Sequence, residues 1–269
     1  MDKYINQIRQ LLSGQCVVAL DTNVLSELEK GTPEWFGGLV KMREGDVKFV
    51  IPDLCIGERL NSYERADAKC LEDMKLKWRM MVSQLDKVIW KDFPCVPLRG
   101  ELYDLVGIKE RDKEEPYIRE RPLTVDGAKE LYRFLCGYEN SQFNVKHSRD
   151  LIITEFKKVR HDWKCCILRK REKWEGKSVK EMCDEQMAEL EAAFEAPIGI
   201  SNLFELPVRV AAERVHDVRY NPTDDEDVNY PTKKNKTACN DGLDYAILFL
   251  VMASVNVCSC DGFLRAQGR

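Results

Sequence analysis

The sequence predicts an α/β fold with a central parallel sheet and a large helical insertion. Two apolar runs of strand length, residues 15–20 and 47–52, are each followed by a helical pattern, and this strand-then-helix order is typical of α/β proteins. Apart from the flanking Gln15, the first run is continuously apolar, as expected for a strand of a parallel sheet that is covered on both faces. A third short strand, VNVCS, is expected after the apolar run 245–253. The α/β segments therefore occupy the two ends of the chain.

The helices of these end segments can be placed from periodicity and from their stop signals. An apolar face within the first twelve residues predicts a short helix that Gly14 ends, and VLSELEK after the first strand predicts a helix that Gly31 closes. A further helix is expected from about Asp53 to Arg65. The run 245–253 is apolar on all sides, so it must be buried if it is a helix.

The middle of the chain is too long to be an ordinary connection between strands of one sheet. We expect a split core, residues 1–62 and 236–269, around a mostly helical insertion of residues 63–235. Within this insertion, apolar residues recur every three to four positions, Gly176 interrupts the pattern, and Pro197 follows its end. This arrangement predicts an αα-hairpin at about 148–196.

Composition limits the class of protein. The chain has 269 residues, 44% of them hydrophobic, and a formal charge of −4, so it can bury a core but has no overall attraction for nucleic acid. None of the eleven cysteines stand at C-x2-C spacing, which favours reduced, buried thiols and a reducing compartment. The N-terminus lacks a signal-peptide pattern, and the apolar run near residue 250 is too short to span a bilayer. We therefore expect a soluble, cytoplasmic protein with no membrane partner.

Four short segments place a carboxylate after a strand or on the helix that follows one: VVALDTN with Asp21, FVIPDLCIGE with Glu58, NDGLDYAILFL with Asp244, and VNVCSCDGF with Asp261. Each acid has an ordinary explanation when taken alone. Asp21 can cap the next helix, and Glu58 can be an exposed helical residue. Asp241 and Asp244 resemble a capping box, and Asp261 can be a turn residue.

The acids are more informative as a set. Parallel strands end at the same edge of a sheet, where ligands collect, and several acids at one edge repel each other unless a cation is bound. Hard divalent cations take oxygen ligands and promote hydrolysis of phosphodiesters. The set therefore predicts a metal-dependent nuclease.

The same segments resemble the four motifs of the PIN-domain nuclease family. LDTNVL at 20–25, IPDLCIGERL at 51–60, DYAI at 244–247 and CSCDGFL at 258–264 match them in order. The resemblance implies a three-layer α/β/α PIN-like fold and Mg²⁺ or Mn²⁺ as cofactor. It also implies hydrolysis by metal-activated water that leaves a 5′-phosphate, commonly on RNA. Small members of the family often act with an inhibitory or regulatory protein partner or as homodimers, and we expect this chain to be similar.

The resemblance also assigns roles to individual residues. The catalytic and metal-binding acids fall on Asp21, Glu58, Asp244 and Asp261, with Asp241 as an auxiliary metal ligand. Asn23 and Ser259 fall on polar positions that support the site or the scissile phosphate.

A basic stretch in the insertion is a candidate surface for the nucleic-acid backbone. Residues 157–180 carry ten Lys or Arg against three Asp or Glu, and Trp163 or Trp174 could stack on bases. A solvated helix face is the equally weighted alternative. The candidate phosphate contacts are Lys157, Lys158, Arg160, Lys164, Lys170 and Arg171.

Two other classes of function stay open. The chain could be a catalytically inert PIN-like module that binds RNA or protein without cutting it. Less favoured is a metal-independent ribonuclease that uses Arg209 and His216, which lie seven residues apart in RVAAERVH and so fall on nearly one face of a helix.

Overall fold

The computed structural model describes most of residues 10–96, the helices between residues 145 and 217, and a few residues near the C-terminus. The described residues are 10, 12–64, 71–96, 145–194, 201–217 and 256–259, together with the single residues 129, 132, 133, 136, 243, 247 and 250. The chain divides into two compact units. Unit 1 comprises Met1–Arg99, Pro116–Phe156 and Ala253–Arg269, and unit 2 comprises Gly100–Glu115 and Lys157–Met252.

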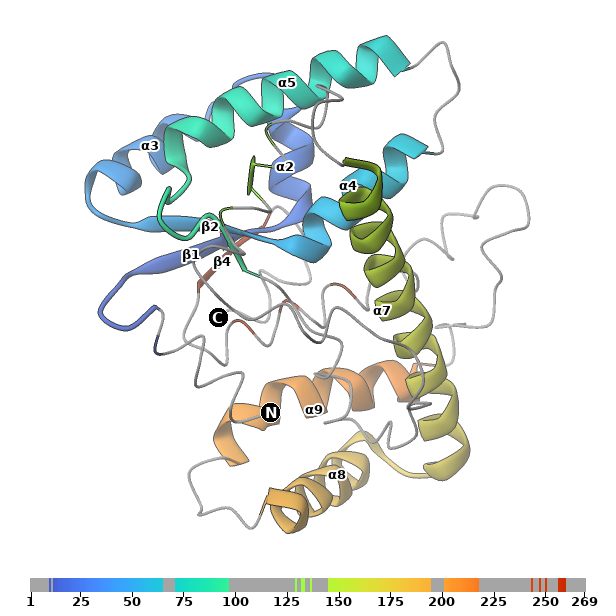
Figure 1. The fold of residues 1–269 in the computed structure, drawn as a ribbon. Coiled ribbons are helices and arrows are strands. Elements are labelled where there is room, and N and C mark those ends of the chain that lie inside the picture. The colour runs from blue at the N-terminus through green and yellow to red at the C-terminus, as the bar shows by residue number, and fades with distance from the viewer. Residues whose placement is uncertain are drawn as a thin grey trace. The chain divides into compact units, whose positions relative to one another are not determined.

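Unit 1 contains a four-stranded parallel sheet (Figure 1). Its strands are β1 (Val17–Leu20), β2 (Lys48–Pro52), β3 (Cys95–Val96) and β4 (Asn256–Cys258). The order across the sheet is β3-β2-β1-β4. Val18 lies opposite both Phe49 and Asn256, and Leu20 lies opposite Cys258. The three strands expected from sequence and their parallel sense are confirmed, whereas the two-residue β3 was not predicted.

The sheet forms the core of unit 1 because its central strands are apolar on both faces. Every residue of β1 is buried, and so are all residues of β2 after Lys48. Val17, Val18 and Val50 are β-branched, which suits the extended backbone. The continuous apolar run read from the sequence thus corresponds to a strand with both faces covered.

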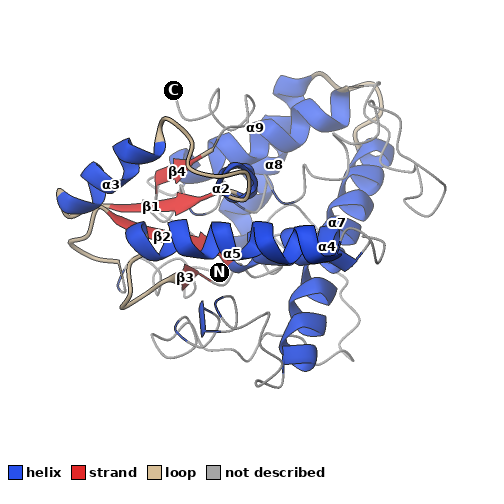
Figure 2. Ribbon diagram, turned by 90° about the horizontal axis from the view of Figure 1, so that it is seen from above, coloured by secondary structure: helices blue, strands red, loops and turns tan. Residues whose placement is uncertain are grey.

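Four helices follow the first two strands. They are α2 (Thr22–Leu28), α3 (Phe36–Glu44), α4 (Asp53–Glu64) and α5 (Leu71–Val88). Helix α2 packs against α4 and α5, and α3 packs against α5. Figures 1 and 2 show α2 and α5 over one face of the sheet. Successive right-handed crossovers in one direction along a sheet place their helices on one face. The three-layer arrangement stays a prediction.

Two glycines end helical segments where the sequence indicates. Gly31, which lies after α2, has φ 137°, and Gly176 has φ 77°. Positive φ values are open to glycine at little steric cost, so both positions stop a helix and redirect the chain. The predicted N-terminal helix lies outside the described residues except for its last turn, where Leu12 is buried.

Helix α7 (Val145–Lys173) begins in unit 1 and ends in unit 2, which also contains α8 (Val179–Phe194) and α9 (Ser201–His216). The apolar stripe of α7 is buried, as its periodicity predicts; its members are Ile152, Phe156, Val159, Trp163 and Ile167. An αα-hairpin was expected at 148–196. Helices α7 and α8 occupy this range with Gly176 between them, and their antiparallel packing stays a prediction. Helix α8 packs along α9, a helix that was expected only as the short segment RVAAERVH.

Unit boundaries differ from those expected. The predicted insertion begins at residue 63, whereas unit 1 extends to Arg99 and so includes α5 and β3. Near the C-terminus, the described residues Leu243, Ile247 and Leu250 are helical and buried, which confirms the buried helix at these positions. They group with unit 2 and not with the sheet.

The described cysteines are all free thiols. Cys55 and Cys95 are buried as expected, but Cys16 and Cys136 are exposed, so the expectation of buried thiols is wrong for these two. Within the described part of the chain, no helix is long and apolar enough to cross a bilayer.

Candidate functional site

The candidate site lies where the order of the sheet reverses. The chain passes from β1 outward to β2 and β3, and β4 then adds on the other side of β1. In open parallel sheets, ligands bind beyond the carboxyl ends of the strands at this reversal. Asp21 follows the last residue of β1, and Ser259 follows the last residue of β4. The reversal thus brings two predicted site residues together.

Asp21 is buried, with 1% of its surface exposed. Its backbone N–H donates to the carbonyl of Cys258 at 3.1 Å, which continues the β1–β4 ladder by one residue. Its carboxylate Oδ2 accepts a hydrogen bond from Ser259 Oγ at 2.6 Å. Residues that are 238 positions apart in the chain therefore meet at one carboxylate.

Asp21 is also the N-cap of α2. Its Oδ1 accepts the backbone N–H of Thr22 at 2.7 Å, and its Oδ2 accepts a weaker bond from Asn23 Nδ2 at 3.3 Å. A capping role explains the first contact. It does not explain the bond from Ser259, which comes from another strand. The carboxylate is therefore oriented by donors from both sides of the sheet reversal.

Glu58 lies in α4, which begins directly after β2, and its side chain is half-buried. Burial raises the pKa of the Cys55 thiol well above its usual range, and the negative charges of Asp21 and Glu58 raise it further. The negative charges of both carboxylates therefore act on one buried thiol of unit 1. The sequence predicted Asp21 and Glu58 as members of one site but gave Cys55 no role.

Asp53 is a buried acid that the sequence analysis treated only as the start of a helix. It follows β2 directly, is 7% exposed, and accepts the N–H of Leu54 at 2.8 Å. Burial raises the pKa of the Cys95 thiol well above its usual range, and the negative charge of Asp53 raises it further. Its position after FVIP repeats that of Asp21 after VVAL, and this parallel was the signal that could have singled it out.

The remaining predicted acids, Asp241, Asp244 and Asp261, lie outside the described residues. Within the described ranges, no group of three or more His, Cys, Asp or Glu side chains is arranged to hold a metal ion. The carboxylate oxygens of Asp21 and Glu58 nevertheless suit a hard cation, since Mg²⁺ is usually held by one or two carboxylates together with waters and substrate phosphate. The donor chemistry of the described acids therefore fits Mg²⁺ or Mn²⁺.

The predicted phosphate-binding residues occupy different surroundings along α7. Lys157 is exposed and Arg160 is half-buried, whereas the side chains of Lys158 and Lys164 lie outside the described part of the structure. Trp163 and Trp174 are 1% and 2% exposed, so neither can stack on bases in this structure. The suggestion that they form a stacking platform was wrong because both face the core.

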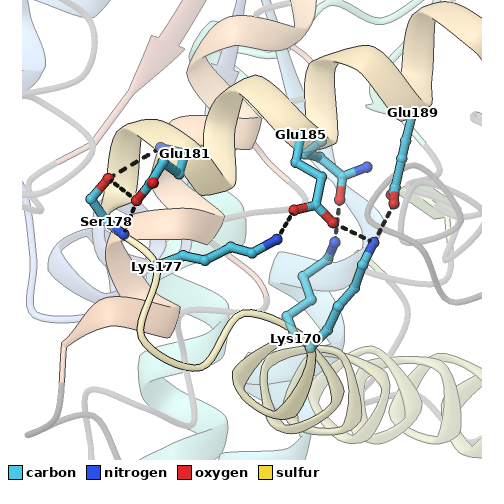
Figure 3. Close-up of polar contacts among 8 residues, drawn as sticks. Lys170, Lys177, Ser178, Glu181, Glu185 and Glu189 are labelled. Atoms are coloured by element: carbon cyan, nitrogen blue, oxygen red, sulfur yellow. Dashed lines mark hydrogen bonds and ion pairs between the residues drawn. The ribbon is translucent and has the colours of Figure 1, made fainter.

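Lys170 and Arg171 make contacts inside unit 2. Lys170 is 5% exposed, donates to Gln186 of α8, and lies 4.1 Å from the centre of the Trp174 ring. Figure 3 shows Lys170 and Lys177 directed toward α8, together with the glutamates of that helix. These contacts stabilise the turn between α7 and α8.

Arg171 caps the end of α9. Its guanidinium donates to the backbone carbonyls of Arg214, Val215 and Asp217 at 3.5, 3.3 and 2.9 Å. Carbonyls at a helix C-terminus have no partner within the helix, and a cation there also interacts favourably with the helix dipole. Arg171 therefore has a structural role that its place in a basic stretch did not indicate.

Arg209 and His216 both lie in α9 and are exposed. Arg209 Nε lies 3.9 Å from Glu213 Oε1 in an ion pair one helical turn away.

No known protein family, curated protein or solved structure matches the chain.

Proposed function

We propose that this protein is a divalent-metal-dependent phosphodiester hydrolase of the PIN-domain type, acting as an endoribonuclease. The observation that carries this proposal is the buried carboxylate of Asp21, held by Ser259 across the sheet reversal. Polar groups buried at the carboxyl edge of a parallel sheet are expected where a ligand binds. The sequence motifs supply the class of ligand.

The residues would divide the work as follows. Asp21 and Glu58 bind the ion, and Asp244 and Asp261, with Asp241 as auxiliary, are the sequence-predicted acids that complete the set. When bound, Mg²⁺ or Mn²⁺ supplies Lewis-acid activation of water and neutralises charge on the phosphate. Ser259 and Asn23 hold the Asp21 carboxylate in one orientation. A fixed carboxylate loses little entropy on binding the ion.

The nucleic-acid surface is proposed on the first half of the basic stretch. Lys157 is exposed and Arg160 is half-buried, so both can reach phosphates, and Lys158 and Lys164 share the same helix. Lys170 and Arg171 have a structural role in this proposal and do not contact phosphate, because their described contacts lie within unit 2. Binding through such cations should weaken steeply with salt.

The test is cleavage of end-labelled single-stranded RNA with Mn²⁺, compared with EDTA and with the Asp21→Asn variant. Asp46→Asn is a suitable control, since Asp46 is exposed and has φ 71°, a conformation that asparagine tolerates. We expect cleavage by the wild type and by Asp46→Asn, and none with EDTA or with Asp21→Asn. Asp21→Asn should also lose the rise in melting temperature that Mn²⁺ gives the wild type.

Other outcomes identify the alternatives. RNA binding without cleavage, and without a Mn²⁺-dependent rise in melting temperature, would favour an inert PIN-like module. Cleavage that survives EDTA but is lost in His216→Ala would favour the metal-independent ribonuclease with Arg209 and His216.

A further inference from the structure

A partly buried ion pair connects the helix that Asp21 caps to the helix that carries Glu58. Arg59 Nε donates to Glu29 Oε1 at 2.9 Å, and its Nη2 contacts Oε2 of the same carboxylate. The side chains are 19% and 6% exposed, respectively. A two-point contact between planar groups fixes orientation as well as distance.

Glu29 and Arg59 lie in or next to the helices that carry the two described acids. Glu29 is the C-cap of α2, and Asp21 is the N-cap of the same helix. Because α2 has seven residues, a contact that holds one end of it also fixes the other end. Arg59 is the immediate neighbour of Glu58 in α4. The pair therefore links the two elements that present the two described acids.

The other neighbour of Glu58 is also fixed. A side-chain carbon at Gly57 would meet the Ile152 carbonyl oxygen at 2.9 Å and Phe156 Cβ at 3.0 Å, so α4 lies tightly against α7 at this point. Successive residues of a helix project about 100° apart, given 3.6 residues per turn. Contacts at Gly57 and Arg59 thus prevent α4 from rotating, and Glu58 lies between them.

We infer that Glu29 and Arg59 form a positioning pair that sets the Glu58 carboxylate relative to Asp21. This inference rests on the proposed function, because it concerns the geometry of the proposed metal site. The pair itself touches neither metal nor substrate. It acts by fixing the rotation of α4 against α2, and a lysine at position 59 would keep the charge but lose the two-point contact.

The test is Mn²⁺ affinity, measured by isothermal titration calorimetry on the full chain. Arg59→Lys should bind Mn²⁺ about tenfold more weakly, a change of about 1.4 kcal/mol. Its kcat on RNA should fall while KM changes little, since the phosphate-binding surface is untouched. Glu29→Gln keeps the shape of the side chain and should weaken Mn²⁺ binding in the same direction if Arg59→Lys folds poorly.

Two control variants separate positioning from general stability. Leu39→Ala removes a buried side chain of α3 and should lower stability without changing Mn²⁺ affinity. Lys77→Gln removes an exposed ion pair with Asp73 and should change neither. The inference is overturned if wild type binds Mn²⁺, Asp21→Asn abolishes binding, and both Arg59→Lys and Glu29→Gln bind as wild type does. A wild-type protein that binds no Mn²⁺ overturns the proposed function, and this inference with it.

Discussion

Replacement of Gly57 by alanine tests the packing of α4 directly. The added methyl would lie 2.9 Å from the Ile152 carbonyl oxygen, 3.0 Å from Ile152 Cγ2 and 3.0 Å from Phe156 Cβ. Carbon atoms prefer a separation of about 3.5–4.0 Å, so the methyl would overlap its carbon neighbours by about 0.5–1 Å. The carbonyl oxygen and Cβ cannot rotate away, because both are attached to the α7 backbone.

The expected loss of stability is the difference between two effects. Forcing an extra methyl into a packed contact costs about 1–3 kcal/mol. Alanine in a helix interior is favoured over glycine by about 0.5–1 kcal/mol. Taking the middle of each range, about 2 and about 0.75 kcal/mol, Gly57→Ala should lower the free energy of unfolding by about 1.25 kcal/mol despite the better helix propensity of alanine.

Urea denaturation followed by circular dichroism measures this change. Gly38→Ala in α3 is the matched control, because a side-chain carbon there meets nothing within 4 Å. It should leave stability unchanged or raise it by about 0.5–1 kcal/mol. If Gly57→Ala proves as stable as wild type with an unchanged denaturant slope, α4 does not pack closely on α7 and the reasoning above is refuted.

Three further predictions concern two ion pairs and one buried thiol. Arg59→Met should lower the free energy of unfolding by about 2 kcal/mol, since hydrogen bonds to charged groups contribute about 1.5–3 kcal/mol. Urea melts should show partial recovery when Glu29→Met is added. A loss below about 0.5 kcal/mol would be typical of an exposed pair and would contradict the contact. A hydrogen bond from Lys177 lowers the pKa of Glu185 from 4.5 to about 2. Because a depressed carboxyl pKa stabilises the folded state only while the group stays ionised, this contribution is complete above about pH 4.5 and is lost as the pH falls to about 2. Glu185→Gln should flatten the thermal-stability profile in that window, and an identical profile would argue against the contact. Burial raises the pKa of Cys55 well above its usual range, so at pH 8 iodoacetamide should modify this thiol slowly in the native protein and rapidly in urea. Mass spectrometry of the peptide that contains Cys55 measures both rates, and equal rates would contradict its burial.

The strands and the first helices could be predicted because their signals are local. Continuous apolar runs identify β1 and β2, and the same runs place Asp21 at a strand end. The two residues of β3, Cys95–Val96, are too few to give a periodic signal. Their strand character comes from pairing with β2, which no local pattern records.

The local composition of the basic stretch did not predict which groups its individual basic residues contact. Lys170 and Arg171 are adjacent in a stretch that predicts exposed cations. In the structure, Lys170 is enclosed by Trp174 and Gln186, and Arg171 caps α9. Net charge in a segment is additive and can be counted from the sequence. Whether each of these side chains is exposed depends on its contacts with helices that follow later in the chain.

The sequence by itself determined the α/β class, the ends of the first strands and the residue types that suit a divalent metal. These features depend on periodicity and chemistry within a few residues. Only the tertiary structure decided the strand order that places β4 beside β1, the hydrogen bond from Ser259 to Asp21, and the ion pair of Arg59 with Glu29. Each of these depends on contacts between distant segments, whose geometry is set when the whole unit packs and not by any stretch of sequence alone.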